Sequence, residues 1–303
     1  MTNACRKDFP LLMAQDIAYL DNAATAQRPQ CVLDAVRRFY CEQNANPLRG
    51  LYPLSIAATD AYENAREAVR RFLNAKSTAE IVFTRNTTEG LNLVAYSYGL
   101  SHIRAGDEVV VSILEHHSDL LPWQMVCRQT GASLKFLDCE PDGSLDLNKA
   151  EALITDRTKL VAVTHVSNVI GRVNPIRQLA DMAHKHGAVL VVDGAQSTPH
   201  IPVDVQALDA DFLAFSGHKV YGPMGIGVLY GKRALLGGRG VRGAAPQVRG
   251  RHRQRRRRGG APRRHRLCAV RGLRGHAPAG AGPDAADAGG HGGHAPHPRH
   301  RLG

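Results

Sequence analysis

Residues 211–230 read DFLAFSGHKVYGPMGIGVLY and hold two strand-like apolar runs separated by a glycine-containing turn. Lys219 lies just beyond the first run, beside Ser216 and His218. Partial removal from water lowers the pKa of a lysine amine and makes the amine nucleophilic, as covalent attachment of a carbonyl compound requires. Taken by itself, this lysine would more often be an ordinary solvated surface residue.

Short runs rich in β-branched residues recur through residues 1–236 and predict seven strands. They are Glu80–Thr84, Glu108–Ile113, Ser133–Asp138, Leu160–His165, Ala188–Asp193, Asp211–Ser216 and Gly225–Tyr230. Apolar residues at helical spacing predict helices at Ala57–Leu73, Thr88–Tyr98 and Ile176–His186. Alternating strands and helices predict an α/β fold, with a mainly parallel seven-stranded sheet and helices on both faces.

Polar residues directly follow five of the predicted strands. They are Thr87-Thr88, Glu115-His116, Ser167-Asn168, Asp193 to Gln196, and Ser216 to Lys219. Because the carboxyl ends of parallel strands lie at one edge of a sheet, where ligands bind in open α/β folds, we expect one shared site. Five coincident signals are more specific than any one of them.

Thr87 and Thr88 lie at the start of the predicted helix Thr88–Tyr98, before its apolar part Leu91–Tyr98, so hydroxyls and free backbone N–H groups face the space before the helix. This arrangement suits a phosphate group, although an ordinary N-cap has the same pattern.

Asp193 ends a nearly continuous apolar run, where an unpaired carboxylate is costly. A protonated ring nitrogen of a cofactor is one suitable partner, and a salt bridge or a capping role is the alternative. His116 is either a packed side chain or an aromatic face stacked on such a ring.

The net charge of +12 comes from the last part of the chain. Residues 237–303 include 16 Arg, 16 Gly, 11 Ala, 7 His and 6 Pro, with 2 acidic residues and no Lys, Ser, Thr or aromatic residue. Without these 16 basic and 2 acidic residues, residues 1–236 contain 23 Lys and Arg against 25 Asp and Glu, a charge of −2. Such a composition predicts a disordered segment and is typical of a G/C-rich gene read out of frame. A genuine basic tail that binds polyanions is the alternative.

The six cysteines include no C-x-x-C pair and no metal-like spacing with histidine, so neither a disulfide framework nor a metal site is expected. The N-terminal MTNACRKDFPLL lacks a signal-peptide pattern, and no apolar run approaches the length of a membrane span. We therefore expect a cytoplasmic protein with no membrane partner.

Six segments together resemble the class V aminotransferase group of fold-type I pyridoxal-phosphate enzymes, and most of all the Suf-type cysteine desulfurases. They are DNAATAQRP (21–29), TRNTTEGLNLVA (84–95), LEHHSDLLPW (114–123), THVSNVIG (164–171), VDGAQS (192–197) and FSGHKVYGPMGIGVLYG (215–231). The resemblance implies an N-terminal segment (1–18), a cofactor-binding large domain (19–236) and an unrelated tail (237–303), with the family's C-terminal small domain absent.

The resemblance also implies a role for each matched residue. Lys219 would bind pyridoxal 5'-phosphate as a Schiff base, and His116 would stack on the ring and assist proton transfers. Asp193 would pair with the ring nitrogen, and Gln196 with the ring hydroxyl. The phosphate would be bound by Thr88, Ser216 and His218, with the Thr87 backbone, and Asn168 would lie near the substrate.

The sequence departs from the family pattern at three places. Leu48-Arg49-Gly50 stands where many relatives have His-Arg-Gly, and Met224 replaces a common Thr. The persulfide-forming cysteine and the arginine that binds the substrate carboxylate belong to the family's C-terminal part. None of the six cysteines, including Cys268 in Arg-Leu-Cys-Ala, has a matching context.

The resemblance implies an enzyme that converts L-cysteine to L-alanine and passes sulfur through an enzyme persulfide to an acceptor protein for iron–sulfur cluster assembly. It also implies a homodimer. Without the C-terminal part, we expect this chain to keep the cofactor ligands but not the sulfur chemistry. A selenocysteine lyase or another class V enzyme is the alternative, because these enzymes share the cofactor ligands. A basic protein that binds nucleic acid through its tail is the non-enzymatic alternative, although nucleic acid is not the expected partner.

Overall fold

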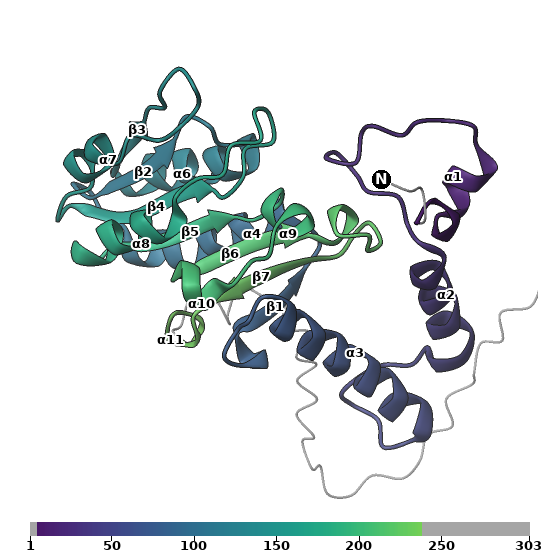
Figure 1. Ribbon diagram of the computed structural model, residues 1–303. Coiled ribbons are helices and arrows are strands. Elements are labelled where there is room, and N and C mark those ends of the chain that lie inside the picture. The colour runs from purple at the N-terminus through teal and green to yellow at the C-terminus, as the bar shows by residue number, and fades with distance from the viewer. Residues whose placement is uncertain (1–4, 238–303) are drawn as a thin grey trace, which may run out of the picture. The chain divides into compact units, whose positions relative to one another are not determined.

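A computed structural model describes residues 5–237, in which seven strands form one sheet in the order β1-β7-β6-β5-β4-β2-β3 (Figure 1). The strands are β1 (Ile81–Thr84), β2 (Glu108–Ser112), β3 (Ser133–Leu137), β4 (Thr158–Thr164), β5 (Val189–Asp193), β6 (Phe212–Ser216) and β7 (Gly227–Gly231). Every predicted strand is present, with its ends within two residues of those expected.

The sheet is mainly parallel, as predicted. β3, β2, β4, β5 and β6 pair in parallel, while β7 is antiparallel to both β6 and β1. Two successive antiparallel pairings restore the direction of β6 in β1. The carboxyl ends of β1, β2, β4, β5 and β6 therefore lie at the same edge of the sheet.

Alternate residues of the central strands enter two separate hydrophobic clusters, one on each face of the sheet. Val110 lies in one cluster, while its neighbours Val109 and Val111 lie in the other. The same alternation holds for Leu213 and Phe212 in β6. Because successive side chains of a strand point to opposite faces, each apolar strand needs cover on both sides.

Helices supply that cover on both faces, as predicted (Figure 1). Residues of α7 (Leu147–Leu153), α8 (Ile176–Lys185) and α10 (Val205–Leu208) pack into the first cluster. Residues of α4 (Thr87–Val94) and α6 (His117–Thr130) pack into the second. The other α-helices are α1 (Pro10–Ala14), α2 (Gln30–Arg38), α3 (Pro53–Phe72), α5 (Leu100–His102), α9 (Ser197–His200) and α11 (Arg233–Leu236). Short 3₁₀ or π turns are η1 (Arg6–Asp8), η2 (Phe39–Gln43), η3 (Thr78–Glu80), η4 (Ala95–Gly99) and η5 (Gly217–Lys219).

Two helix boundaries differ from the prediction. α3 begins at Pro53 rather than Ala57, because proline at the first helical position loses no hydrogen bond and has a suitable φ angle. The predicted helix Thr88–Tyr98 is not a single α-helix, since α4 ends at Val94 and the π turn η4 follows. Apolar periodicity does not distinguish these two types of turn.

Residues 1–4 and 238–303 lie outside the described part of the chain. The segment 237–303, for which the sequence predicts disorder, therefore lies outside the described residues except for Gly237. Among residues 5–237, no helix combines the length and the apolar character needed to cross a membrane.

Candidate functional site

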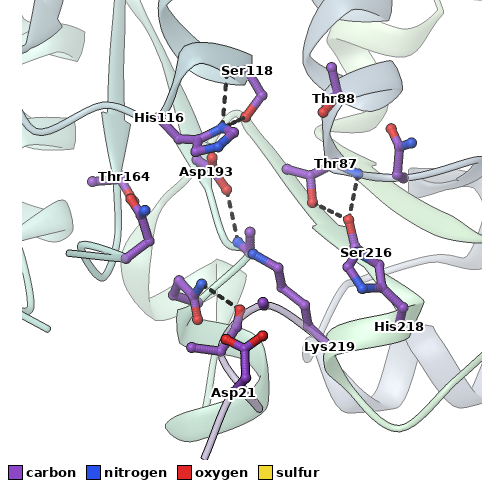
Figure 2. Close-up of a pocket in the computed structure, with 16 residues that line it drawn as sticks. Asp21, Thr87, Thr88, His116, Ser118, Thr164, Asp193, Ser216, His218 and Lys219 are labelled. Carbon is purple, nitrogen blue, oxygen red and sulfur yellow. Dashed lines mark hydrogen bonds between the residues drawn. The ribbon is translucent and has the colours of Figure 1, made fainter. Parts of the chain in front are cut away.

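A cavity of about 490 Å³ lies at the edge where the carboxyl ends of the strands meet (Figure 2). All nine residues that the sequence singled out line it. They are Thr87, Thr88, His116, Asn168, Asp193, Gln196, Ser216, His218 and Lys219. The strand-end argument therefore brought together residues that are up to 132 positions apart in the sequence.

The N-terminus of α4 forms one wall of the cavity. Asn86 caps this helix by accepting a hydrogen bond from the Glu89 amide at 2.8 Å. The Ser216 hydroxyl accepts a hydrogen bond from the Thr87 amide at 2.9 Å and lies 2.7 Å from the Thr87 hydroxyl. These hydroxyls and the positive end of the helix dipole suit an anionic group.

Asp193 lies at the end of β5 with only 3% of its surface exposed. Its Oδ1 atom accepts a hydrogen bond from the Ala195 amide at 2.8 Å. Burial raises the pKa of the Asp193 carboxyl, while that hydrogen bond and the charges of Lys219 and His116 oppose the rise. A cationic group in the cavity would stabilise the ionised form.

Lys219 lies in η5, directly after β6, and its side chain extends toward Asp193 in Figure 2. Burial lowers the pKa of the Lys219 amine, although the nearby Asp193 charge acts in the opposite direction. A lysine with a lowered pKa has more of its amine in the neutral, nucleophilic form.

His116 is the N-cap residue of α6 and reaches the cavity from the end of the β2–α6 loop. Its Nδ1 atom accepts a hydrogen bond from the Ser118 amide at 3.1 Å and lies 2.7 Å from the Ser118 hydroxyl. Because the amide can only donate, this arrangement requires Nδ1 to be unprotonated, and the ring proton of neutral His116 is then on Nε2.

The segment from Asp21 to Arg28 closes another side of the cavity. Gln196 Nε2 donates a hydrogen bond to the Ala23 carbonyl at 3.0 Å, and the Ala26 amide donates to the His218 carbonyl at 2.9 Å. His218 Nδ1 lies 3.2 Å from the Thr25 hydroxyl. Burial, together with the charges of Lys219 and Arg28, lowers the pKa of His218.

Seven lining residues were not predicted as site residues: Asp21, Ala23, Ala24, Asn86, Ser118, Thr164 and Ala195. Thr164 ends β4, so the strand-end rule could have found it. Asp21, Ala23 and Ala24 follow no predicted strand, and only the DNAATAQRP resemblance pointed to their segment.

The sequence model of the aminotransferase class-V family matches residues 18–242. The chain belongs to the aminotransferase class-V family. Enzymes of this family depend on pyridoxal phosphate. The family match confirms the resemblance seen in the sequence motifs, and the fold agrees with the fold-type I large domain that the resemblance implied.

Among class-V relatives, the chain is 51% identical over 235 residues to a probable cysteine desulfurase of Halalkalibacterium halodurans and to a cysteine desulfurase of Escherichia coli. Each match covers 76% of this chain and 58% of the relative. The chain thus spans less than two thirds of the length of these relatives.

Two solved structures show the same fold. The cysteine desulfurase CsdA from Escherichia coli has a TM-score of 0.71 and 44% identity, covering 78% of this chain and 59% of that one. The apo cysteine desulfurase of Thermococcus onnurineus NA1 has a TM-score of 0.74 and 45% identity, covering 78% and 58%.

The residues of the cavity fit the class-V cofactor. The volume of the cavity lies within the range of small-molecule sites. The hydroxyls of Thr87 and Ser216 suit the phosphate, and the buried Asp193 carboxylate suits a protonated ring nitrogen. The Lys219 amine of lowered pKa suits an aldehyde carbon.

Proposed function

We propose that this chain binds pyridoxal 5'-phosphate in the cavity, with Lys219 as the covalent anchor, and that residues 19–236 are the cofactor-binding domain of a cysteine desulfurase. The observation that carries the proposal is the position of Lys219, whose amine has a lowered pKa, beside the buried Asp193 carboxyl in a cavity lined by hydroxyls. The cysteine desulfurases among the relatives support the choice of reaction.

Each side of the cofactor has matching residues in this proposal. Thr87, Thr88, Ser216 and His218 hold the phosphate at the N-terminus of α4. Asp193 faces the ring nitrogen, Gln196 the ring hydroxyl, and His116 one face of the ring, with Asn168 near the substrate. When bound, pyridoxal phosphate supplies an electron sink for bonds at the substrate's α-carbon.

The protein's own groups hold and move the protons. Because its pKa is lowered, the half-buried Lys219 amine is neutral in a larger fraction of molecules than an exposed lysine amine is. A neutral amine that is not bonded to the cofactor can accept a proton. His116 Nδ1 is engaged by Ser118, so Nε2 is the nitrogen left to exchange a proton in the cavity. Asp193 keeps a negative charge where the ring nitrogen needs one.

For the complete reaction we propose L-cysteine as the substrate, with L-alanine and an enzyme persulfide as products, in a cytoplasmic homodimer that passes sulfur to an acceptor protein for iron–sulfur cluster assembly. None of the cysteines in residues 1–303 has the sequence context of the family nucleophile. We therefore expect this chain to bind the cofactor without completing the sulfur transfer.

The test is to incubate the purified full chain with pyridoxal phosphate, record the visible absorbance, reduce with borohydride and locate the modified lysine by mass spectrometry. We expect a visible band and modification at Lys219, both lost in Lys219→Ala and retained in Lys185→Ala, which removes an exposed lysine. Absence of uptake, or modification mainly at another lysine, would refute the proposal.

The sulfur chemistry is tested separately by adding L-cysteine to the loaded chain and measuring alanine and protein persulfide. We expect neither product above the level of free pyridoxal phosphate. Alanine formed at a rate that depends on Lys219, with a persulfide on one of the six cysteines, would show that the chain contains a nucleophile which its sequence context does not reveal.

A further inference from the structure

Two buried carboxyl groups lie directly behind the His116 loop, outside the set of residues assigned to the cofactor. Glu115 precedes His116, and Asp119 lies in the first turn of α6. Glu115 Oε1 accepts hydrogen bonds from the Ser112 hydroxyl and, at 2.9 Å, from the Thr164 amide. Asp119 Oδ1 accepts one from the Trp123 indole at 2.9 Å.

The other oxygen of each group, Glu115 Oε2 and Asp119 Oδ2, is inaccessible to solvent, and no N–H or hydroxyl group of the described residues donates to it. The two side chains are near enough to shift each other's pKa through a hydrogen bond. Ionised carboxylates can only accept hydrogen bonds, so such a bond requires a proton on one of the two groups. Two ionised groups here would leave both oxygens without a donor at a large cost in free energy.

The surroundings place this proton on Asp119. Burial raises the pKa of Asp119 well above its usual range, and the nearby negative charges of Glu115 and Asp193 raise it further. Burial also raises the pKa of Glu115, to about 7, but hydrogen bonds from Asp119, Ser112 and the Thr164 amide favour its ionised form. Asp119 is therefore the donor and Glu115 the acceptor.

The pair also holds the loop that carries His116. Glu115 joins the loop to β4 through the Thr164 amide, and the Asp119 amide donates a hydrogen bond to the His116 carbonyl at 2.8 Å. His116 thus lies between the two members of the pair in the sequence and is bonded to one of them. Both carboxyl groups therefore belong to residues of the backbone segment that carries the imidazole, and Glu115 also bonds that segment to β4 through its carboxyl group.

We propose that Asp119 carries a proton at neutral pH and donates it to Glu115, and that this pair is a positioning device for His116. The second part rests on the proposed cofactor function. The charged group that acts on both carboxyls is Asp193, at the end of β5, and Lys219 and His116 act in turn on Asp193. Because a neutral Asp119 adds no negative charge near Asp193, it does not raise the pKa of Asp193 further.

The protonation state is tested by infrared spectroscopy of the full chain at pH 7 without cofactor. A protonated carboxylic acid has a C=O stretching band that ionised carboxylates lack. We expect this band in the wild type and a clear loss of its intensity in Asp119→Asn, whose amide can donate to Glu115 in the same way. The control Asp142→Asn removes an exposed carboxyl group whose pKa is lowered mainly by hydrogen bonds from Ser144, and should leave the band unchanged. A wild type without the band, or a band that keeps its full intensity in Asp119→Asn, would overturn the proposal, whereas a weaker residual band is expected from Glu115, whose pKa is raised to about 7.

The positioning role is tested by visible circular dichroism per mole of bound pyridoxal phosphate, which reports how the ring is held. We expect Asp119→Asn to match the wild type, and Asp119→Leu, which cannot donate to Glu115, to fall to the level of His116→Ala. If Asp119→Leu does not fold, Ser112→Ala removes a different donor to Glu115 and should give a smaller loss. An unchanged signal in the folded variant would overturn the positioning role. A chain that takes up no cofactor would instead refute the proposed function, and the infrared result would still decide the protonation state.

Discussion

The Ser216 hydroxyl is 2.7 Å from the Thr87 hydroxyl and accepts a hydrogen bond from the Thr87 amide, although the two residues are 129 positions apart. Both are buried, at the carboxyl end of β6 and at the start of α4. The contact joins the end of β6 to the start of α4 at the point where we propose the phosphate binds.

Ser216→Ala should weaken pyridoxal phosphate binding, because it removes one of the hydroxyls that we propose bind the phosphate. A lost hydrogen bond of this kind costs about 1–2 kcal/mol, or roughly tenfold in Kd. The measurement is an absorbance titration with Ser101→Ala, an exposed serine, as the control. Equal affinities for the wild type and Ser216→Ala would argue against a phosphate at this position.

Gly227→Ala should disturb the site without touching the cofactor. A Cβ atom on Gly227 would lie 2.5 Å from the Asn86 Cα atom, and Asn86 caps α4. Because the obstacle is backbone, we expect a loss of about 1–3 kcal/mol in the free energy of unfolding, as for other overpacked positions, and weaker cofactor binding. Urea denaturation checks the first effect.

Gly237→Ala is the matched control for this substitution, since its Cβ atom would meet its nearest neighbour at an ordinary 3.4 Å. If the two variants proved equally stable, the close approach of Gly227 to Asn86 would not constrain α4.

Asp193→Asn should lower the pKa of the Lys219 amine further. The Asp193 charge is the influence that raises this pKa against the effect of burial, and an amide removes the charge while Oδ1 can still accept the Ala195 hydrogen bond. Competitive amine labelling followed by mass spectrometry should show faster labelling of Lys219 in Asp193→Asn at neutral pH. Exposed Lys185 is the internal reference. Slower labelling of Lys219 would contradict the electrostatic link between the two residues.

His165→Gln should reduce the loss of stability in acid. His165 is buried, its Nδ1 atom has no partner among the described residues, and burial lowers its pKa from 6.5 to about 4. Because the folded-state pKa is depressed, the unfolded chain binds the proton more tightly. The stability from neutral His165 is therefore present above pH 6.5 and lost as the pH falls toward 4.

The shift corresponds to roughly 3 kcal/mol over this window, at about 1.4 kcal/mol per pKa unit. Urea denaturation of the wild type and His165→Gln at several pH values from 7 to 4 should show a flatter curve for the variant. Parallel curves would mean that His165 does not bind its proton differently in the two states.

The strands, and the meeting of the nine strand-end residues in one cavity, were predictable because they depend on local features. Val109, Val110 and Val111 are all apolar although they point to alternate faces of the sheet, and such a run predicts a strand that is covered on both faces. The polar residues that follow the run mark the carboxyl end of the strand. The start of η4 at Ala95 was not predictable, since a π turn keeps the apolar character of the helix before it.

The amino-acid sequence alone predicted the alternation of strands and helices, the polar residue types at the strand ends and the family to which the chain belongs. The fold was needed to show that Ser216 contacts Thr87, that the segment at Ala23 closes the cavity, and that Glu115 accepts a hydrogen bond from the Thr164 amide of β4. The reason is physical. Periodicity records which faces of an element are buried, whereas contacts between distant residues depend on strand order and register, which place side chains from separate elements within hydrogen-bond distance.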